Sequence, residues 1–185
     1  MLKEILSEKE IQKICKDIAK QIEKKFENTN SIPVLIGVMT GALPFMMDLI
    51  KNIKSYCLLD FIQVSSYSGT TSTGKITIKK DISENITGKD IVIIEDIIDT
   101  GLTFDFVTKY LSQTYHPKSI TTVTLLDKKC MRKVQFEVDI VGKEIPNEFV
   151  VGYGLDYNGL IRNTTNIYVP TKAEIEEIDS LLANQ

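Results

Sequence analysis

Apolar residues along the chain follow two spacings, and each predicts a different kind of element. Residues 33–39 (PVLIGVM) and 90–96 (DIVIIED) are apolar at successive positions, which is typical of strands buried on both faces of a parallel sheet. Residues 11–26 instead place isoleucines and a phenylalanine three or four positions apart, on one face of a helix. Ser7 and Glu10 have the spacing of a capping box and predict that this helix begins after Ser7.

The rest of the chain continues this alternation of strands and helices. Further strands are predicted over 57–67, 76–80, 119–127, 134–141 and 166–169, and further helices over 42–53, from 104 to near His116, and over 173–183. Such alternation predicts an α/β fold with a central parallel sheet covered by helices on both sides. The stretch 67–75 (YSGTTSTGK) is rich in glycine and hydroxyl residues, which predicts a loop long enough to act as a lid.

The composition fits one domain of an ordinary globular protein. The 185 residues carry 22 basic and 25 acidic side chains, and the net charge of -3 gives no general attraction to nucleic acid or membrane. Cys15, Cys57 and Cys130 are widely spaced and odd in number, which favours reduced thiols. Early acidic residues argue against a signal peptide, and prolines and glycines interrupt the longest apolar stretch, 32–47. We therefore expect a cytoplasmic protein without nucleic-acid or membrane partners.

Three acidic residues, Glu95, Asp96 and Asp99, lie within five positions at the end of the strand 90–96. This is the edge of a parallel sheet where ligands bind. Clustered carboxylates repel one another, by about 1 kcal/mol per pair at roughly 4 Å in water and more when buried, so they require cations or hydroxyl donors nearby. The residues that follow, Thr100–Thr103, combine a glycine turn, two hydroxyls and a helix N-terminus, which favours phosphate binding. A ribose 5-phosphate would satisfy both halves; the alternative is an acidic strand end that only caps the helix.

The segment 92–103 (VIIEDIIDTGLT) resembles the phosphoribosyl pyrophosphate motif of the type I phosphoribosyltransferases. The resemblance extends to GVMTGALPFMMDL (37–49), SSYSGTTSTGK (65–75), TLLDKKCMRK (124–133) and IPNEFVVGYGLDYNGLIRN (145–163), and along nearly the whole chain it is to the hypoxanthine-guanine phosphoribosyltransferases. It implies a type I phosphoribosyltransferase fold in a single domain, 1–185, with a hood lobe mainly from 137–185 and a lid loop at 66–76. It also implies transfer of a 5-phosphoribosyl group from phosphoribosyl pyrophosphate to N9 of hypoxanthine or guanine, giving IMP or GMP, with Mg²⁺ as cofactor.

By this resemblance, the acidic loop holds the ribose and performs proton transfer. Glu95 and Asp96 bind the ribose hydroxyls and, together with Asp156, accompany the metal. Asp99 is the general acid/base near N7 of the purine. The 5-phosphate cradle is formed by Thr100, Gly101, Leu102 and Thr103. The pyrophosphate is contacted by Thr40, Gly41, Arg162 and the lid pair Ser66 and Tyr67.

The resemblance also assigns the purine pocket. Lys128 donates a hydrogen bond to O6 of the base, which rejects adenine because two donors would face each other. Phe149 stacks on the purine, and the backbone of Val150 contacts its N1 and position-2 edge. Arg132 corresponds to a family arginine near the acidic loop. Without the family match, Lys128 and Arg132 could equally be surface residues of a basic run, and Phe149 could belong to the core.

One position departs from the family pattern: Thr40 precedes Gly41 where a lysine or arginine is usual. We expect weaker binding of the phosphoribosyl donor for this reason. We also expect a cis peptide bond between Met39 and Thr40 in the substrate-bound protein.

Two other functions remain open at this point. The same fold could serve a non-catalytic regulator that binds RNA, although Lys128, Phe149 and the lid argue against it and the charge shows no basic bias. A metal-dependent phosphatase could use Asp96 and Asp99, but it leaves Phe149 and the late segment without a role. The resemblance further implies a homodimer or homotetramer.

Overall fold

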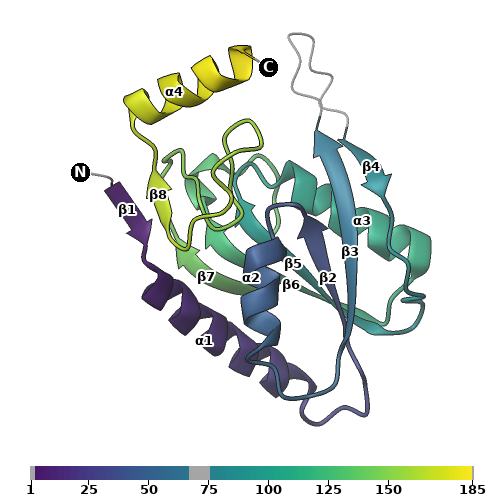
Figure 1. Ribbon diagram of the computed structural model, residues 1–185. Helices are drawn as coiled ribbons and strands as arrows, with labels where there is room; N and C mark the ends of the chain where they lie inside the picture. Colours follow the sequence, from purple (N-terminus) through teal and green to yellow (C-terminus); the bar gives the residue numbers. More distant parts are fainter. Residues whose placement is uncertain (1–2, 67–75, 185) are drawn as a thin grey trace.

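The computed structural model describes residues 3–66 and 76–184, and a six-stranded sheet forms its centre (Figure 1). The strand order is β4-β3-β2-β5-β6-β7, and every neighbouring pair is parallel except β3 with β4. The strands of this sheet are β2 (Val34–Met39), β3 (Leu58–Ser66), β4 (Ile76–Lys80), β5 (Asp90–Ile98), β6 (Ser119–Asp127) and β7 (Ile140–Glu144). The predicted α/β fold with a mostly parallel central sheet is confirmed.

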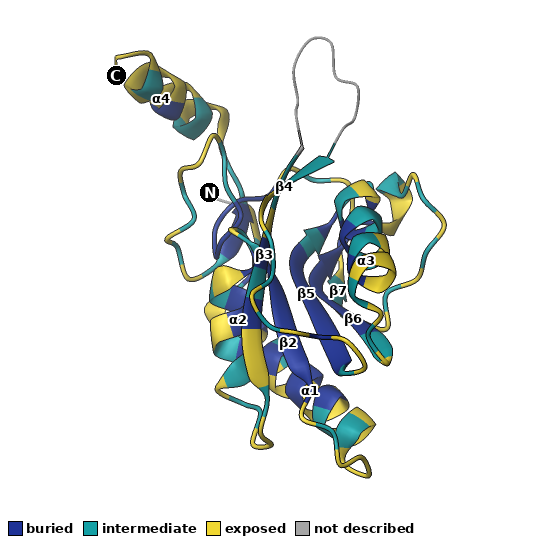
Figure 2. Ribbon diagram, turned by 90° about the vertical axis from the view of Figure 1, so that its right-hand side faces the viewer, coloured by how far each residue is buried: buried dark blue, intermediate teal, exposed yellow. Residues whose placement is uncertain are grey.

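Helices cover both faces of this sheet, because successive strand residues point to opposite sides. On one face, Leu35 of β2 and Val92 of β5 pack against α1 (Glu8–Phe26) and α2 (Leu43–Ile50). The strand residues that alternate with these point to the other face, where they pack against α3 (Leu102–Tyr115). The central strands β2 and β5 are consequently buried along almost their whole length (Figure 2).

The first helix begins where the sequence predicts. The Ser7 hydroxyl accepts a hydrogen bond from the Glu10 amide, and the Glu10 carboxylate accepts one from the Ser7 amide at 2.9 Å. These reciprocal bonds satisfy two amides that a helix start would otherwise leave unpaired. At the other end of the chain, α4 (Lys172–Ala183) begins at Thr171, whose hydroxyl accepts from the Glu174 amide.

Two elements differ from the sequence prediction. The strand expected over 134–141 is wrong in position: residues 134–139 form no regular element, and β7 begins at Ile140, where pairing with Val123 of β6 starts. A short strand, β1 (Lys3–Leu6), was not predicted, and it pairs with β8 (Ile167–Val169) in a separate antiparallel ribbon. The strand β1 is defined only by its pairing with a distant segment, and its four residues are too few to show a hydrophobic pattern that predicts a strand.

Strands near the two ends of the chain, β1 and β8, pair in this ribbon. The helix α4 follows β8 and projects from the rest of the molecule (Figure 1). Because β7 belongs to the large sheet, a hood lobe made by the chain ends would begin after Glu144. The division into a core and a hood lobe stays a prediction. None of the helices in the described ranges is long and apolar enough to cross a membrane.

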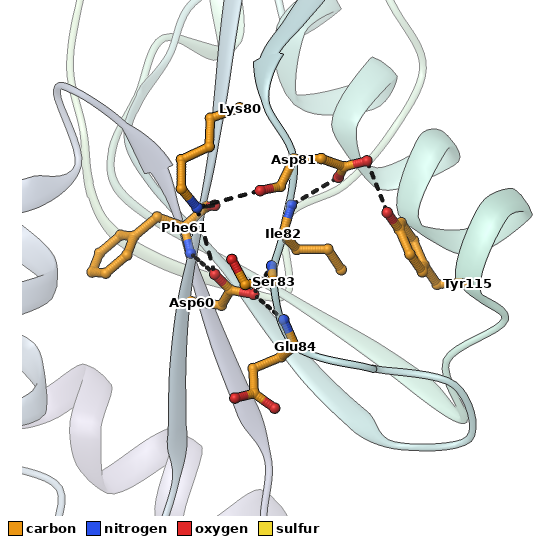
Figure 3. A network of polar contacts seen from close by, with 8 residues as sticks. All are labelled: Asp60, Phe61, Lys80, Asp81, Ile82, Ser83, Glu84 and Tyr115. Carbon is orange, nitrogen blue, oxygen red and sulfur yellow. Dashed lines mark hydrogen bonds and ion pairs between the residues drawn. The ribbon is translucent and has the colours of Figure 1, made fainter.

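Carboxylates fix the segment that follows β4 on the sheet and on α3 (Figure 3). Asp60 of β3 is 5% exposed and accepts hydrogen bonds from the amides of Ser83 and Glu84 at 2.6 and 2.7 Å. Asp81 accepts from the hydroxyl of Tyr115 at 2.8 Å and from that of Tyr110, both on α3. The β3–β4 pair is thereby tied to the helix whose other end carries the predicted phosphate cradle.

Candidate active site

Three parallel strands end at the same edge of the sheet, and each is followed by predicted site residues. Gly37 of β2 pairs with Ile94 of β5, and Ile98 of β5 pairs with Asp127 of β6. The next residues beyond these ends are Thr40, Asp99 and Lys128. The parallel register therefore brings together groups that lie up to 88 positions apart in the sequence, a separation read from their numbers.

The predicted phosphate cradle is a tight turn that leads into α3. Gly101 occupies the N-cap position with φ of 80°, a left-handed conformation that glycine adopts without steric cost. The amides of the first helical turn, from Leu102 on, therefore face outward without helical partners. A cavity of about 110 Å³ opens at this turn, lined by Glu95, Ile97, Ile98, Asp99, Thr100, Gly101, Thr103 and Phe104. Its size and its amides suit a phosphate group.

Glu95 and Asp96 are buried acids, each 8% exposed. Burial raises the pKa of Glu95 well above its ordinary value, and the neighbouring charge of Asp96 raises it further. Burial also raises the pKa of Asp96, although Arg162 and the amide of Ile97, which donates to Oδ1 at 2.7 Å, act in the opposite direction. Two such carboxylates favour a bound cation or hydroxyl donors in front of them.

Asp99, which lines the cavity, forms an ion pair with Lys128. The Lys128 ammonium lies 3.4 Å from Oδ2 of Asp99, and its side chain is only 7% exposed, whereas that of Asp99 is 46% exposed. The other oxygen of Asp99, Oδ1, is buried and has no hydrogen-bond partner among the described residues. A carboxylate with one unsatisfied oxygen beside a buried ammonium is arranged for exchanging protons or hydrogen bonds with a ligand.

The loop after β2 packs directly on the acidic pair. A methyl group at Gly41 would lie 1.8 Å from Oδ2 of Asp96, so only glycine fits there. A methyl at Gly154, which has φ of 99°, would lie 2.1 Å from the Gly41 carbonyl oxygen. The peptide bond between Met39 and Thr40 is cis in the structure; the expectation concerned the substrate-bound form. The Thr40 side chain is exposed beside this bond.

Arg162 joins the late segment to this loop. Its guanidinium donates to the carbonyl of Gly154 at 2.5 Å and forms an ion pair with Oδ1 of Asp156 at 2.8 Å. The other oxygen of Asp156 accepts from the Gly159 amide at 2.7 Å. Asp156 is thus engaged with Arg162, and within 3–66 and 76–184 no three acidic, histidine or cysteine side chains gather as a metal site.

Phe149 and Val150 lie between β7 and β8. Phe149 is 52% exposed, and its ring meets that of Tyr157 edge to face at 5.9 Å. A half-exposed ring that is held from one side can stack on a flat ligand with its free face. The Val150 side chain is buried, which fixes the backbone of this segment. Of the predicted lid pair, Ser66 ends β3 and Tyr67 lies outside the described residues.

One group that supports the site is missing from the sequence-based predictions. The Tyr153 hydroxyl donates to Oδ2 of Asp48 on α2 at 2.8 Å, and Gln12 of α1 donates to the same oxygen at 2.6 Å. Tyr153 precedes Gly154, so this network holds the late segment against Gly41 and its neighbours. The available signal was a tyrosine in an otherwise apolar stretch, because a buried hydroxyl requires a partner.

Comparisons with known proteins find relatives along nearly the whole chain. The family model of the phosphoribosyl transferase domain matches residues 1–158. A curated hypoxanthine-guanine phosphoribosyltransferase of Bacillus subtilis is 47% identical over 175 residues, which cover 94% of this chain and 96% of the relative. A crystal structure of a hypoxanthine phosphoribosyltransferase from Staphylococcus aureus is 44% identical, with a TM-score of 0.85 and coverage of 92% of this chain and 91% of that chain.

A structure of the Trypanosoma cruzi hypoxanthine phosphoribosyltransferase, in complex with the product IMP, is also similar. It is 35% identical, with a TM-score of 0.85, and the match covers 92% of this chain and 95% of that chain. The sequence identity and the structural similarity both extend over nearly the full length of the chain. The chain therefore belongs to the phosphoribosyltransferase family.

Proposed function

We propose that this protein transfers the 5-phosphoribosyl group of phosphoribosyl pyrophosphate to N9 of hypoxanthine or guanine, releasing pyrophosphate and forming IMP or GMP. The observation that carries the proposal is the meeting of Glu95, Asp96 and Asp99 with the amides of the Thr100–Thr103 turn at one edge of the sheet. These groups complement the hydroxyls and the phosphate of one ribose 5-phosphate. The family membership and the names of the relatives support the same reaction.

Each part of the substrate has a candidate partner. The turn from Thr100 to Thr103 binds the 5-phosphate through its amides and hydroxyls. Glu95 and Asp96 accept hydrogen bonds from the ribose hydroxyls. Arg162, with the backbone at Thr40 and Gly41, contacts pyrophosphate. The pair Ser66 and Tyr67 belongs to a lid that closes over it and excludes water.

The purine is recognised by residues from the segments that follow β6 and β7. Lys128 donates to O6, Phe149 stacks on the ring, and the backbone of Val150 contacts the N1 and position-2 edge. Asp99 accepts the proton that leaves N7 of the purine as N9 bonds to C1 of the ribose and the bond between C1 and pyrophosphate breaks. Positive charge then develops on the ribose, and the nearby carboxylates of Glu95 and Asp96 stabilise it electrostatically.

Magnesium is the cofactor that fits this donor set. Mg²⁺ usually keeps several waters and binds through one or two carboxylates plus substrate phosphates, so it does not need three protein ligands in one cluster. Glu95 and Asp96, whose raised pKa values reflect burial, would hold it through the ribose side, and Asp156 would act near the pyrophosphate. The ion would supply neutralisation of charge on the pyrophosphate oxygens.

We also propose that the protein is a cytoplasmic homo-oligomer. Its three cysteines are free, as in a reducing compartment. On the face that carries α2, Leu43 and Met47 are 37% and 43% exposed, and Leu59 of β3 is 42% exposed. Apolar side chains of this kind suit contact with a second copy. Sedimentation of the protein, with a Met47→Lys variant for comparison, tests this surface.

A transfer assay tests the proposed reaction. The purified protein, phosphoribosyl pyrophosphate and one of four purines (hypoxanthine, guanine, xanthine and adenine) are mixed with or without Mg²⁺, and nucleotides are separated by chromatography. IMP and GMP should form only with Mg²⁺, and AMP should not. The Asp99→Asn variant should lose about 10²- to 10⁴-fold in kcat. RNA retention without turnover, or phosphate release from simple monoesters, would contradict the proposal.

A further inference from the structure

The turn that carries Asp99 rests on the segment that follows β6. The amide of Lys133 donates to the carbonyl of Thr100 at 2.9 Å. A methyl group at Gly101 would lie 2.9 Å from Cδ of Arg132 and 3.0 Å from Cγ2 of Val134. The turn is therefore in close contact with the Arg132 side chain, and its position depends on where that side chain stands.

Arg132 is itself fixed by charge and by stacking. Its Nη2 forms an ion pair with Asp127, the last residue of β6, whose side chain is only 2% exposed. The guanidinium lies over the ring of Phe136, 5.0 Å from its centroid. That ring packs at 5.6 Å against Phe104 in the first turn of α3. The guanidinium thus connects the end of β6 to the start of the helix that follows the turn.

The remaining amino group of Arg132 is directed toward the turn. Nη1 is buried without a hydrogen-bond partner in the described part of the chain, and it lies 3.1 Å from where a Gly101 methyl would stand. Asp127 pairs in register with Ile98, the residue immediately before Asp99. The buried carboxylate of Asp127 therefore holds Arg132 against the turn that follows β5. On that side, Nη1 of Arg132 remains available to donate a hydrogen bond.

We propose that Arg132, held by Asp127, is a positioning residue that fixes the turn 99–103 and so sets the place of the Asp99 carboxylate and of the phosphate-binding amides. This inference rests on the proposed function, because it assigns Arg132 a part in binding the phosphoribosyl donor. Arg132 contacts the turn and does not contact the reacting atoms. The planar guanidinium of Arg132 is required, because one of its amino groups pairs with Asp127 while its flat face stacks on the Phe136 ring.

The test compares Arg132→Lys, Asp127→Asn and the double variant with the unchanged protein. Both single variants should raise the KM for phosphoribosyl pyrophosphate by about 10- to 100-fold, since small displacements of a binding turn are costly, and should change the KM for hypoxanthine far less. Lysine keeps the positive charge but lacks the planar guanidinium, so the charge alone should not keep the KM at the value of the unchanged protein. The double variant should lose no more than the worse single variant, because both residues act through one contact.

Lys129→Met is the matched control. Lys129 begins the short 3₁₀ turn Lys129–Met131, which ends just before Arg132, and it pairs with the exposed Glu144, so its removal should leave both KM values unchanged. Binding of phosphoribosyl pyrophosphate, measured by calorimetry with Mg²⁺ at a temperature where every variant is folded, provides a readout that a purely structural role would not move.

Two outcomes overturn the inference: an unchanged KM for phosphoribosyl pyrophosphate in folded Arg132→Lys, or losses that add in the double variant. Additive losses would mean that the two residues act separately. The unchanged protein is assayed first. If it transfers no phosphoribosyl group, the proposed function fails; if it is active and the variants match it, only the role of Arg132 fails.

Discussion

The Nζ atom of Lys128 lies 3.4 Å from Oδ2 of Asp99, so the residue proposed to read the purine and the residue proposed to move its proton are in contact. Lys128 is 6% exposed, and its backbone amide donates to the carbonyl of Ile98 at 2.9 Å. The ends of β5 and β6 are thereby connected through both main chain and side chain. In the proposed reaction, a purine that binds here would replace the contact between Lys128 and Asp99 with contacts to its O6 and N7 atoms.

Lys128→Gln should relax the discrimination against adenine. The glutamine amide can turn its oxygen toward an exocyclic amine, whereas an ammonium can only donate. We expect kcat/KM for hypoxanthine to fall by roughly five- to 150-fold, corresponding to about 1–3 kcal/mol, while that for adenine falls less or rises. Competition between the two bases measures this ratio. Lys129→Gln, an exposed neighbour, should leave the ratio unchanged, and equal losses for both bases in Lys128→Gln would refute the role.

Gly41→Ala should lower activity much more than Gly88→Ala does. The added methyl would lie 1.8 Å from the Asp96 carboxylate, so either the loop after β2 or Asp96 must move. We expect kcat/KM to fall by about 100-fold or more, because displacement of a binding group by about 1 Å has effects of this size. Gly88→Ala is the control: its methyl meets nothing within 4 Å, and its φ of 68° makes it costly for stability alone. Higher activity in Gly41→Ala than in Gly88→Ala would contradict this account.

Tyr153→Phe should weaken the contact between the late segment and the loop after β2. The change removes a hydrogen bond of 2.8 Å to Asp48, so we expect a loss of about 1–2 kcal/mol in the free energy of unfolding. Because Gly154 rests on Gly41, the KM for phosphoribosyl pyrophosphate should rise at the same time. Denaturant unfolding and steady-state kinetics measure the two effects. Tyr157→Phe, which removes an exposed bond to Asp179, should change neither by a comparable amount.

Asp81→Ala should make the free energy of unfolding less dependent on pH in the acidic range. Burial alone would raise the pKa of Asp81, but hydrogen bonds from Tyr110, Tyr115 and the Ile82 amide outweigh it and hold the pKa below its ordinary value. A lowered folded-state pKa gives stability that is present above the unfolded-state pKa and is lost as the pH falls through the folded-state pKa.

The difference in free energy of unfolding between the unchanged protein and Asp81→Ala should therefore be about 2 kcal/mol near neutral pH. It should shrink as the pH falls below the ordinary pKa of an aspartate and through the lower pKa of Asp81 in the folded protein. Urea unfolding at a series of pH values measures it. Asp17→Ala serves as the control. Because its partner Lys20 is exposed, the difference in free energy of unfolding should be small and should not change with pH. A difference that grows on acidification would have the wrong sign for this network.

The sequence predicted the elements whose pattern is local. Residues 90–96 are apolar at successive positions because β5 is buried on both faces, and Ser7 with Glu10 marked the start of α1 through a bond between near neighbours. It could not predict β1, because that strand exists only through pairing with β8, more than 160 positions away by number. The strand expected over 134–141 was misplaced because its first part packs against other groups than a strand partner: Val134 lies against Gly101, and Phe136 lies under the guanidinium of Arg132.

The same distinction applies to the site. The acidic cluster and the glycine turn are contiguous, so their spacing alone favoured a sugar phosphate. The contacts of Gly41 with Asp96 and of Gly154 with Gly41 depend on three segments meeting in space, and no short pattern encodes them. For Asp156, the family resemblance predicts a position near the metal, whereas its side chain is paired with Arg162 in this structure. The proposed metal role stays a prediction.

A crystal structure of the protein with IMP bound tests the central claim most directly. We predict that the 5-phosphate accepts hydrogen bonds from the amides of the turn 100–103, that the ribose hydroxyls face Glu95 and Asp96, and that Lys128 and Asp99 reach O6 and N7 of the base. A nucleotide bound elsewhere, with its phosphate away from this turn, would contradict the account.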